Sequence, residues 1–172
     1  VAAACRDDTG RGRAAEAEAE FSTVLKADGT DQAAALFSLG DSQFAAKDFG
    51  LAEESYGRVA TEFPDHELAD DAAYSQCLSL EKLGRLDDGL KKTGEFLTKH
   101  TKSPHVAAIQ FLQGEFHYRK GDYPTAITNY QKVAETQGDL QDDALYKLGW
   151  AQRLSDKPAE AVKTFERRSA EI

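Results

Sequence analysis

The sequence predicts an all-α protein built from about five repeated helical hairpins. The first observation is a small residue that recurs five positions after a tight turn, at spacings of 35, 37, 37 and 35 residues: Ala17, Ala52, Gly89, Ala126 and Ala161. The second is another small residue upstream of each turn, at Cys5, Gly40, Cys77, Gly114 and Gly149. Repetition at this period indicates stacked units that cannot bury their apolar faces alone.

Small residues in both helices of a hairpin have a shared purpose. Two antiparallel helices approach closely only where neither carries a large side chain at the crossing. An aromatic follows the second small residue by four positions in four of the five repeats, at Phe21, Tyr56, Tyr130 and Phe165. We expect this ring to fill the wedge between neighbouring hairpins. The chain then forms one segment, 1–172, with repeats at about 1–32, 33–68, 69–105, 106–141 and 142–172.

The first two repeats turn at Gly12-Arg13 and at Lys47-Asp48, and Pro64 stops the second helix of repeat 33–68. Cys5 occupies the packing slot of its repeat. Because small residues precede it, Cys5 also fits the lipid-acceptor cysteine of a secretory signal, and both interpretations stay open. The chain contains no Met. We expect it to be a piece of a longer protein.

The third repeat departs from the pattern. Its first helix opens at Asp70-Asp71, where carboxylates cap free N–H groups and complement the helix dipole. A turn at Gly84-Arg85 follows, but Thr93 stands where the other repeats carry an aromatic. Gly89 and Gly94 lie inside the second helix, and each costs about 1 kcal/mol relative to Ala. The segment 86–97 is therefore predicted to be the least protected helix.

The last two repeats carry clear signals at their helix ends. The turn at Gly121-Asp122 is followed by Pro124, and Pro158 follows the turn at Asp156-Lys157. Both prolines fall in the first turn of a second helix, where a missing N–H is tolerated. Asp142-Asp143 opens the first helix of the final repeat.

The pattern resembles the tetratricopeptide repeat (TPR) family over the whole chain. The matching residues are Gly40, Ala52, Tyr56 and Pro64 in one repeat, Gly114, Gly121, Ala126 and Tyr130 in another, and Leu145, Gly149, Ala161 and Phe165 in the last. The resemblance implies a right-handed superhelical solenoid of antiparallel helix hairpins. It also implies a non-enzymatic scaffold that binds a protein or peptide partner in a concave groove lined by the first helices.

The residues that the register places on this groove are mainly aromatic. The candidate peptide-binding residues are Phe37, Phe44, Tyr74, Phe111, Tyr118, Arg119, Tyr146, Trp150 and Arg153. Aromatic side chains bring contact area at low entropic cost, and Trp, Tyr and Arg dominate binding hot spots. The alternative is that Phe37, Tyr74 and the residues in register with them pack between repeats, since periodicity does not separate core from concavity.

One binding mode of the family is not expected. Members that hold chaperone C-termini clamp a carboxylate with Lys and Asn, and the corresponding slots here hold Phe37, Tyr74, Phe111 and Tyr146. The nearby Asp41 and Glu115 would repel a carboxylate.

Several function classes are not supported by the sequence. A net charge of −9 disfavours nucleic acid, and no apolar run is long enough to span a bilayer. No nucleophile elbow, phosphate-binding loop or dinucleotide fingerprint is present, so we expect no catalytic residue and no cofactor. His66, His100 and His105 fall in predicted loops, where solvated side chains are expected rather than a metal site.

The loops between repeats suggest a compartment. FPDHELADDA and ETQGDLQDDA resemble loops of bacterial envelope TPR proteins, among them the lipoprotein of the outer-membrane barrel-assembly complex and a periplasmic coordinator of cell-wall synthesis. A periplasmic or outer-membrane-associated scaffold is predicted, with the cytoplasm as the alternative. Two other roles stay open: a spacer or homo-oligomer that associates through its terminal helices or convex face, and a regulatory segment of a larger enzyme.

Overall fold

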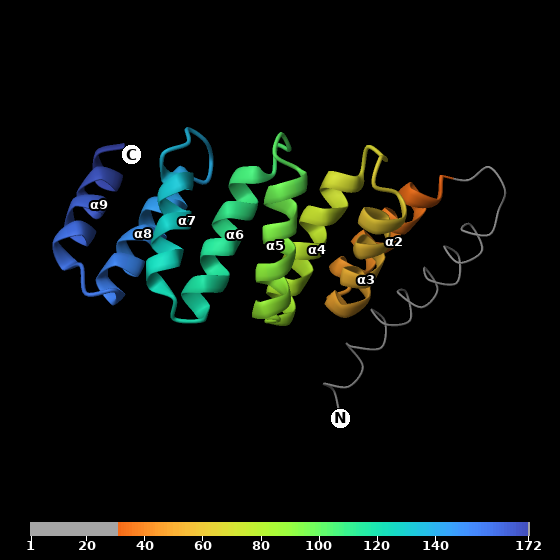
Figure 1. Cartoon of the computed structure of the whole chain (residues 1–172), viewed down its shortest axis with the longest axis horizontal. Coiled ribbons are helices and arrows are strands. Elements are labelled where there is room, and N and C mark those ends of the chain that lie inside the picture. Colours follow the sequence, from red (N-terminus) through yellow and green to blue (C-terminus); the bar gives the residue numbers. More distant parts are fainter. Residues whose placement is uncertain (1–30, 172) are drawn as a thin grey trace, which may run out of the picture. The chain divides into compact units, whose positions relative to one another are not determined.

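The computed structural model describes residues 31–171, in which eight α-helices and no β-strand are present (Figure 1). The all-α prediction is confirmed. The chain divides into two units, Val1–Leu83 and Gly84–Ile172, called unit 1 and unit 2 below. The predicted first repeat, with Cys5, Ala17 and Phe21, lies outside the described residues.

The described part of unit 1 contains three helices, α2 (Gln32–Ala45), α3 (Phe49–Glu62) and α4 (Ala69–Leu83). The α3 helix packs against both α2 and α4. Asp31 caps α2 by accepting a hydrogen bond from the Ala34 N–H at 3.0 Å. The buried core combines residues of all three helices: Ala33, Leu36, Ala52, Tyr56, Val59 and Ala72.

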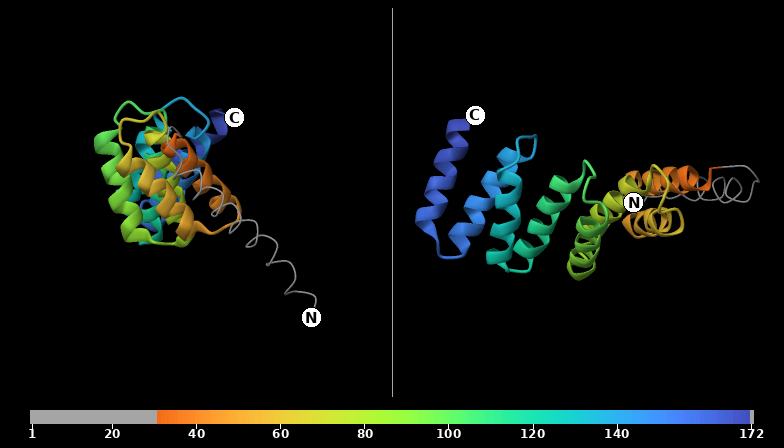
Figure 2. Two further views of the ribbon diagram at one scale, coloured as in Figure 1. Left: turned by 90° about the vertical axis from the view of Figure 1, so that its right-hand side faces the viewer. Right: turned by 45° about the horizontal axis from the view of Figure 1, so that its top comes forward.

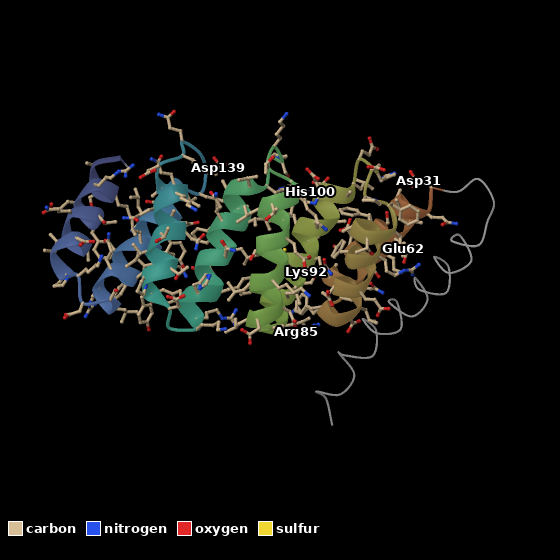
Figure 3. All side chains as sticks on the ribbon, viewed as in Figure 1. Asp31, Glu62, Arg85, Lys92, His100 and Asp139 are labelled. Atoms are coloured by element: carbon tan, nitrogen blue, oxygen red, sulfur yellow. The ribbon has the colours of Figure 1, made fainter. Side chains whose placement is uncertain are left out.

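Unit 2 contains the other five helices, α5 (Leu86–Lys99), α6 (Val106–Arg119), α7 (Tyr123–Ala134), α8 (Gln141–Leu154) and α9 (Pro158–Glu171). Each packs antiparallel against the next, which both Figure 1 and Figure 2 show. The core between α7 and α8 is formed by Ala126, Ile127, Tyr130, Val133, Ala134, Ala144, Leu145, Leu148 and Ala151. Within unit 2, His100 and Asp139 lie on one edge, and Arg85 lies at the opposite end of α5 from His100 (Figure 3).

The turns inside the hairpins share one backbone feature. Lys47 (φ 66°), Gly84 (φ 68°), Gly121 (φ 78°) and Asp156 (φ 57°) all adopt the left-handed conformation. Gly121 and Gly84 adopt it without a steric penalty, whereas Lys47 and Asp156 do not. The predicted helix starts are also present, with Pro124 in the first turn of α7 and Pro158 at the start of α9.

The small residue in the first helix of a hairpin is required because an aromatic ring packs directly on it. A Cβ added at Gly40 would stand 2.7 Å from Tyr56 Cε1, and one at Gly114 would stand 2.7 Å from Tyr130 Cε1. At Gly149 it would stand 2.5 Å from two ring carbons of Phe165. The aromatic of each second helix thus packs on the first helix of its own hairpin.

In the third repeat, the ring that packs on the small residue comes from a different helix. Thr93 is fully buried and donates a hydrogen bond to the Gly89 carbonyl at 2.9 Å. The ring that Thr93 lacks comes from Phe116 of α6, which is fully buried and lies against Gly89 so closely that a Cβ there would overlap it. Sequence reasoning missed Phe116. The sequence did hold an indication of this contact. Phe116 is a large residue at a position that is small in the other repeats, where the register places Ser42, Ser79 and Ala151.

Candidate interaction surface

The predicted groove residues lie on first helices in both units. Phe37 and Phe44 are on α2 and Tyr74 is on α4, all in unit 1. Phe111, Tyr118 and Arg119 are on α6, and Tyr146, Trp150 and Arg153 are on α8, all in unit 2.

In unit 1, two of the three aromatic residues pack against rings of α3. The Phe37 ring meets Tyr56 edge-on, with ring centroids 5.5 Å apart, and Phe44 meets Phe49 in the same way at 5.1 Å. Phe37, Phe44 and Tyr74 are all half-buried. Burial raises the pKa of the Tyr74 hydroxyl above its usual value. These contacts agree with the packing alternative more closely than with an open aromatic ladder.

On α6 the aromatic residues are also partly engaged. Phe111 packs against Tyr130 at 5.6 Å between ring centroids, and Tyr118 meets Tyr123 edge-on at 5.5 Å. The Lys147 ammonium lies 5.7 Å from the centre of the Tyr118 ring, a cation–π contact. Tyr118 is half-buried and Arg119 is exposed at the end of the helix.

Two acidic residues that the sequence placed near the groove form hydrogen bonds with tyrosines of the second helices. Asp41 accepts a hydrogen bond from the Tyr56 hydroxyl at 2.7 Å, and Glu115 accepts one from Tyr130 at 2.6 Å. Burial, and then these hydrogen bonds, raise the pKa of both tyrosines. Glu115 also binds the Lys147 ammonium at 2.8 Å. Their first role is therefore to satisfy buried hydroxyls rather than to repel a ligand.

The final hairpin differs at these same positions. Trp150 occupies the slot of Asp41 and Glu115, and Phe165 replaces the tyrosine. Trp150 and Phe165 pack edge-on with centroids 6.2 Å apart, and Tyr146 contacts both, at 6.2 Å and 6.5 Å. The indole N–H of Trp150 is buried with no acceptor among the described residues. We call Tyr146, Trp150 and Phe165 the aromatic triad.

Two guanidinium groups flank the aromatic triad. Arg153 lies 5.0 Å from the Trp150 ring centre, and Arg168 lies 5.0 Å from that of Tyr146. Arg168 also forms two hydrogen bonds with Asp142, at 2.6 Å and 2.8 Å, which lower the pKa of that carboxyl group. In the part of the chain that the structure describes, Arg153 has no carboxylate partner. The triad therefore presents an aromatic surface beside an uncompensated positive charge.

The histidines do not assemble a metal site in residues 31–171, where no group of three metal-binding side chains occurs. The expectation that His66 is a solvated loop residue was incomplete. Its Nε2 lies 3.1 Å from Asp31 Oδ2, and its Nδ1 accepts a hydrogen bond from the Leu68 N–H at 3.1 Å. His66 thus ties the loop after α3 to the start of α2.

Comparison with known families agrees with the hairpin architecture. Tetratricopeptide repeat models match residues 6–67 and 74–141, and a second model of the same repeat matches 143–167. The chain belongs to the tetratricopeptide repeat family. That membership makes it a protein–protein interaction scaffold in general terms. No curated protein sequence matches the chain.

Solved structures share the fold at low sequence identity. A crystal structure of MamA has a TM-score of 0.75 at 20% identity, covering 94% of this chain and 85% of that chain. BtubC from P. vanneervenii has a TM-score of 0.76 at 13% identity, covering 94% and 72% respectively. MamA from Desulfovibrio magneticus RS-1 has a TM-score of 0.72 at 15% identity, covering 95% and 93%. At such identities the likeness shows the fold alone.

A membrane-spanning helix was not expected, and the helices of the described residues include none that is both long and apolar enough to cross a bilayer.

Proposed function

We propose that the chain is a non-enzymatic scaffold that binds a peptide or protein segment on the first-helix surface of unit 2, centred on the final hairpin. The observation that carries this proposal is the aromatic triad beside Arg153. Tyr146 is 41% exposed although it is a large aromatic residue, and the Arg153 guanidinium stacks on Trp150 without a carboxylate partner in the described chain. Exposed aromatic and arginine side chains are the residue types that dominate binding hot spots.

Tyr118 and Arg119 extend this surface onto α6. Lys147 connects the two helices, because its ammonium binds Glu115 and also lies over the Tyr118 ring. Phe37, Phe44 and Phe111 contribute mainly by packing against aromatic rings of the second helices. The partner that suits such a surface carries apolar side chains and a carboxylate, because the uncompensated charge at Arg153 is positive.

A capture experiment tests this function directly. The chain and a Tyr118→Ala/Trp150→Ala variant are immobilised and exposed to the same cell extract, with a Leu51→Ala variant as the matched control. Leu51 is 42% exposed on α3, which belongs to unit 1 and contributes no residue to the proposed surface. A partner retained by the parent and by Leu51→Ala, but lost from the double variant, supports the proposal. Equal capture by all three proteins, with circular dichroism unchanged, contradicts it.

We further propose that the scaffold acts in a bacterial envelope assembly, in the periplasm or at the outer membrane. The support is the likeness of the loops at 63–72 and 135–144 to those of envelope TPR proteins. Separation of periplasmic from cytoplasmic fractions of the source cells tests this compartment. Recovery of the protein in the cytoplasmic fraction contradicts it.

The competing role is a spacer or homo-oligomer with contacts through its ends. The observation that favours it is the exposed Val162 on the last helix, at 55% of its surface. Sedimentation that depends on protein concentration, and is unchanged by Tyr118→Ala/Trp150→Ala, would favour self-association over the groove.

A further inference from the structure

Two hairpins of the chain, α2–α3 in unit 1 and α6–α7 in unit 2, repeat the same ring contacts. In α2–α3 the Phe37 ring meets Tyr56 at 5.5 Å between ring centroids. Phe44 meets Phe49 at 5.1 Å. A shift of 74 positions gives the corresponding residues of α6 and α7: Phe111, Tyr130, Tyr118 and Tyr123. Their two ring pairs are 5.6 Å and 5.5 Å apart. The two hairpins therefore share one arrangement of rings, and a polar difference between them is informative.

The α6–α7 hairpin holds an ammonium group. Glu115 accepts a hydrogen bond from the Tyr130 hydroxyl on one carboxylate oxygen, at 2.6 Å, and binds the Lys147 ammonium with the other, at 2.8 Å. Lys147 comes from α8, the helix that packs on α7, and its ammonium also lies 5.7 Å from the centre of the Tyr118 ring. A carboxylate beside an aromatic ring is thus the arrangement with which this hairpin binds a lysine.

Unit 1 contains the same arrangement without the lysine. Asp41 accepts a hydrogen bond from the Tyr56 hydroxyl at 2.7 Å, and Phe44, one turn further along α2, supplies the ring. The helix that packs on α3 is α4, and its residue in the position of the lysine is Ser75. Burial and the Asp41 hydrogen bond raise the pKa of Tyr56, and a hydrogen bond with Ser75 opposes that rise. Ser75 therefore reaches the same cluster, but its hydroxyl brings no positive charge.

The cations in the described part of unit 1 do not replace that charge. The lysine and arginine residues in 31–83 are Lys47, Arg58 and Lys82. Arg58 and Lys82 pair with glutamates of their own helices, and no ion pair joins Lys47 to Asp41. Asp41 is exposed, whereas the Glu115 side chain is only 20% exposed beneath its lysine. Within residues 31–83, Asp41 thus lacks the counter-charge that Glu115 has.

We propose that Asp41 and Phe44 form a site for a lysine side chain of a protein partner, held as unit 2 holds Lys147. The ammonium binds the second oxygen of Asp41, and the methylene stem lies along the Phe44 ring. The lysine site goes beyond the proposed function, because it lies on unit 1 and selects a cation, whereas the surface on unit 2 selects a carboxylate. Since one exposed ion pair contributes little affinity, the lysine is one anchor of a longer contact.

Two matched peptides test the lysine site on the whole chain. Both are blocked peptides of alanine with one central residue, which is lysine in one peptide and norleucine in the other, so that they differ only in the ammonium group. Binding is followed by titration of the NMR shifts of Asp41, Phe44 and Tyr56. We expect the lysine peptide to bind about fivefold more tightly, as an exposed ion pair allows, and high salt to reduce this preference.

Two variants locate the preference at Asp41. Asp41→Asn keeps an acceptor for the Tyr56 hydroxyl but removes the charge, so it should abolish the preference for lysine. Ser75→Lys places a lysine of the chain itself in the position of Lys147. It should therefore also abolish the preference, although Asp41 is unchanged. Circular dichroism and a thermal melt check that both variants fold.

The converse variant is Lys147→Ser, which removes the lysine of unit 2. It should create a second lysine-selective site, detected as peptide-dependent shifts at Glu115 and Tyr118, because the carboxylate and the ring remain. The readout of the lysine site lies on α2, whereas the capture experiment changes residues of unit 2. Failure of the lysine site is therefore distinguishable from failure of the proposed function.

Several results would overturn the proposal. They are equal affinity of the two peptides, no binding of either, a lysine preference that persists in Asp41→Asn or in Ser75→Lys, and no new site in Lys147→Ser. Concentration-dependent dimers of the parent chain that Asp41→Asn abolishes would also overturn it, because they would assign the site to a second copy.

Discussion

At the scale of single residues, the most informative feature is a pair of positions fifteen residues apart. Asp41 meets Tyr56 and Glu115 meets Tyr130 through a hydroxyl–carboxylate hydrogen bond. Trp150 meets Phe165 through ring contact instead. The chemistry of the two positions therefore changes together. The sequence alone placed Asp41 and Glu115 on the groove, because their hydroxyl partners become visible only when the two helices of a hairpin are brought together.

Tyr130→Phe should lower the free energy of unfolding by about 1 kcal/mol, the usual contribution of such a hydrogen bond. The ring still covers Gly114, so packing is kept. Urea denaturation at neutral pH measures the change. Phe165→Tyr is the matched comparison, because it adds a hydroxyl where the facing slot holds Trp150 rather than a carboxylate. An unchanged free energy of unfolding in both variants would contradict this account.

The raised pKa values of Tyr56 and Tyr130 predict a loss of stability at high pH. A group whose pKa is higher in the folded state favours folding below its unfolded pKa, and that contribution declines as pH rises above it. The unfolded value is about 10. Urea unfolding should therefore show falling stability above about pH 10, and Tyr130→Phe should reduce the slope. A slope that Tyr130→Phe leaves unchanged would argue against the buried pair.

At the scale of helices, α5 remains the predicted weak element, and its two glycines have different causes. Gly89 is required, because Phe116 occupies the space of its Cβ. The nearest atom to a Cβ at Gly94 is Gln113 Nε2 at 4.0 Å, which is ordinary contact. The sequence alone assigned the same destabilisation to Gly89 and Gly94. The difference depends on the contact between Gly89 and Phe116, which lies on the next helix, α6.

Gly94→Ala should raise the free energy of unfolding by about 1 kcal/mol, because it removes a helix-interior glycine without a clash. Gly89→Ala should lower it, because the Phe116 ring must move out of a close-packed position. Chemical denaturation measures the change in the free energy of unfolding of each variant, which should have opposite signs. Hydrogen exchange on the parent chain checks that 86–97 is the least protected helix. Stabilisation by Gly89→Ala would show that the Phe116 contact is wrongly assigned.

Lys47→Gly should stabilise the turn between α2 and α3. Lys47 adopts a left-handed φ of 66°, which costs a residue with a Cβ about 1 kcal/mol and costs glycine little. The gain is partly offset by the greater freedom of glycine in the unfolded chain. A thermal melt is expected to shift upward. Ala46→Gly, at a right-handed position, should shift it downward, and a downward shift in both variants would refute the argument.

At the scale of the whole molecule, the sequence was sufficient for the helices, turns and small packing residues of the described part, 31–171, because these follow from local periodicity. The division of the aromatic residues between packing and exposure was not predictable from that periodicity. Phe111 and Tyr146 share one slot, yet Phe111 packs against Tyr130 while Tyr146 is 41% exposed. That difference depends on which neighbouring helix covers each residue, which the repeat pattern does not encode.

The measurement that tests the central claim most directly is site-specific photocrosslinking in the source cells. A photoreactive phenylalanine analogue is placed at Tyr146 in the final hairpin and, in a separate protein, at Leu51 in unit 1, both of which are exposed. The account predicts a protein adduct from position 146 that is lost when Trp150→Ala is added, and none from position 51. Adducts from position 51 alone, or an adduct at 146 that Trp150→Ala does not diminish, would contradict the claim that the final hairpin is the docking surface.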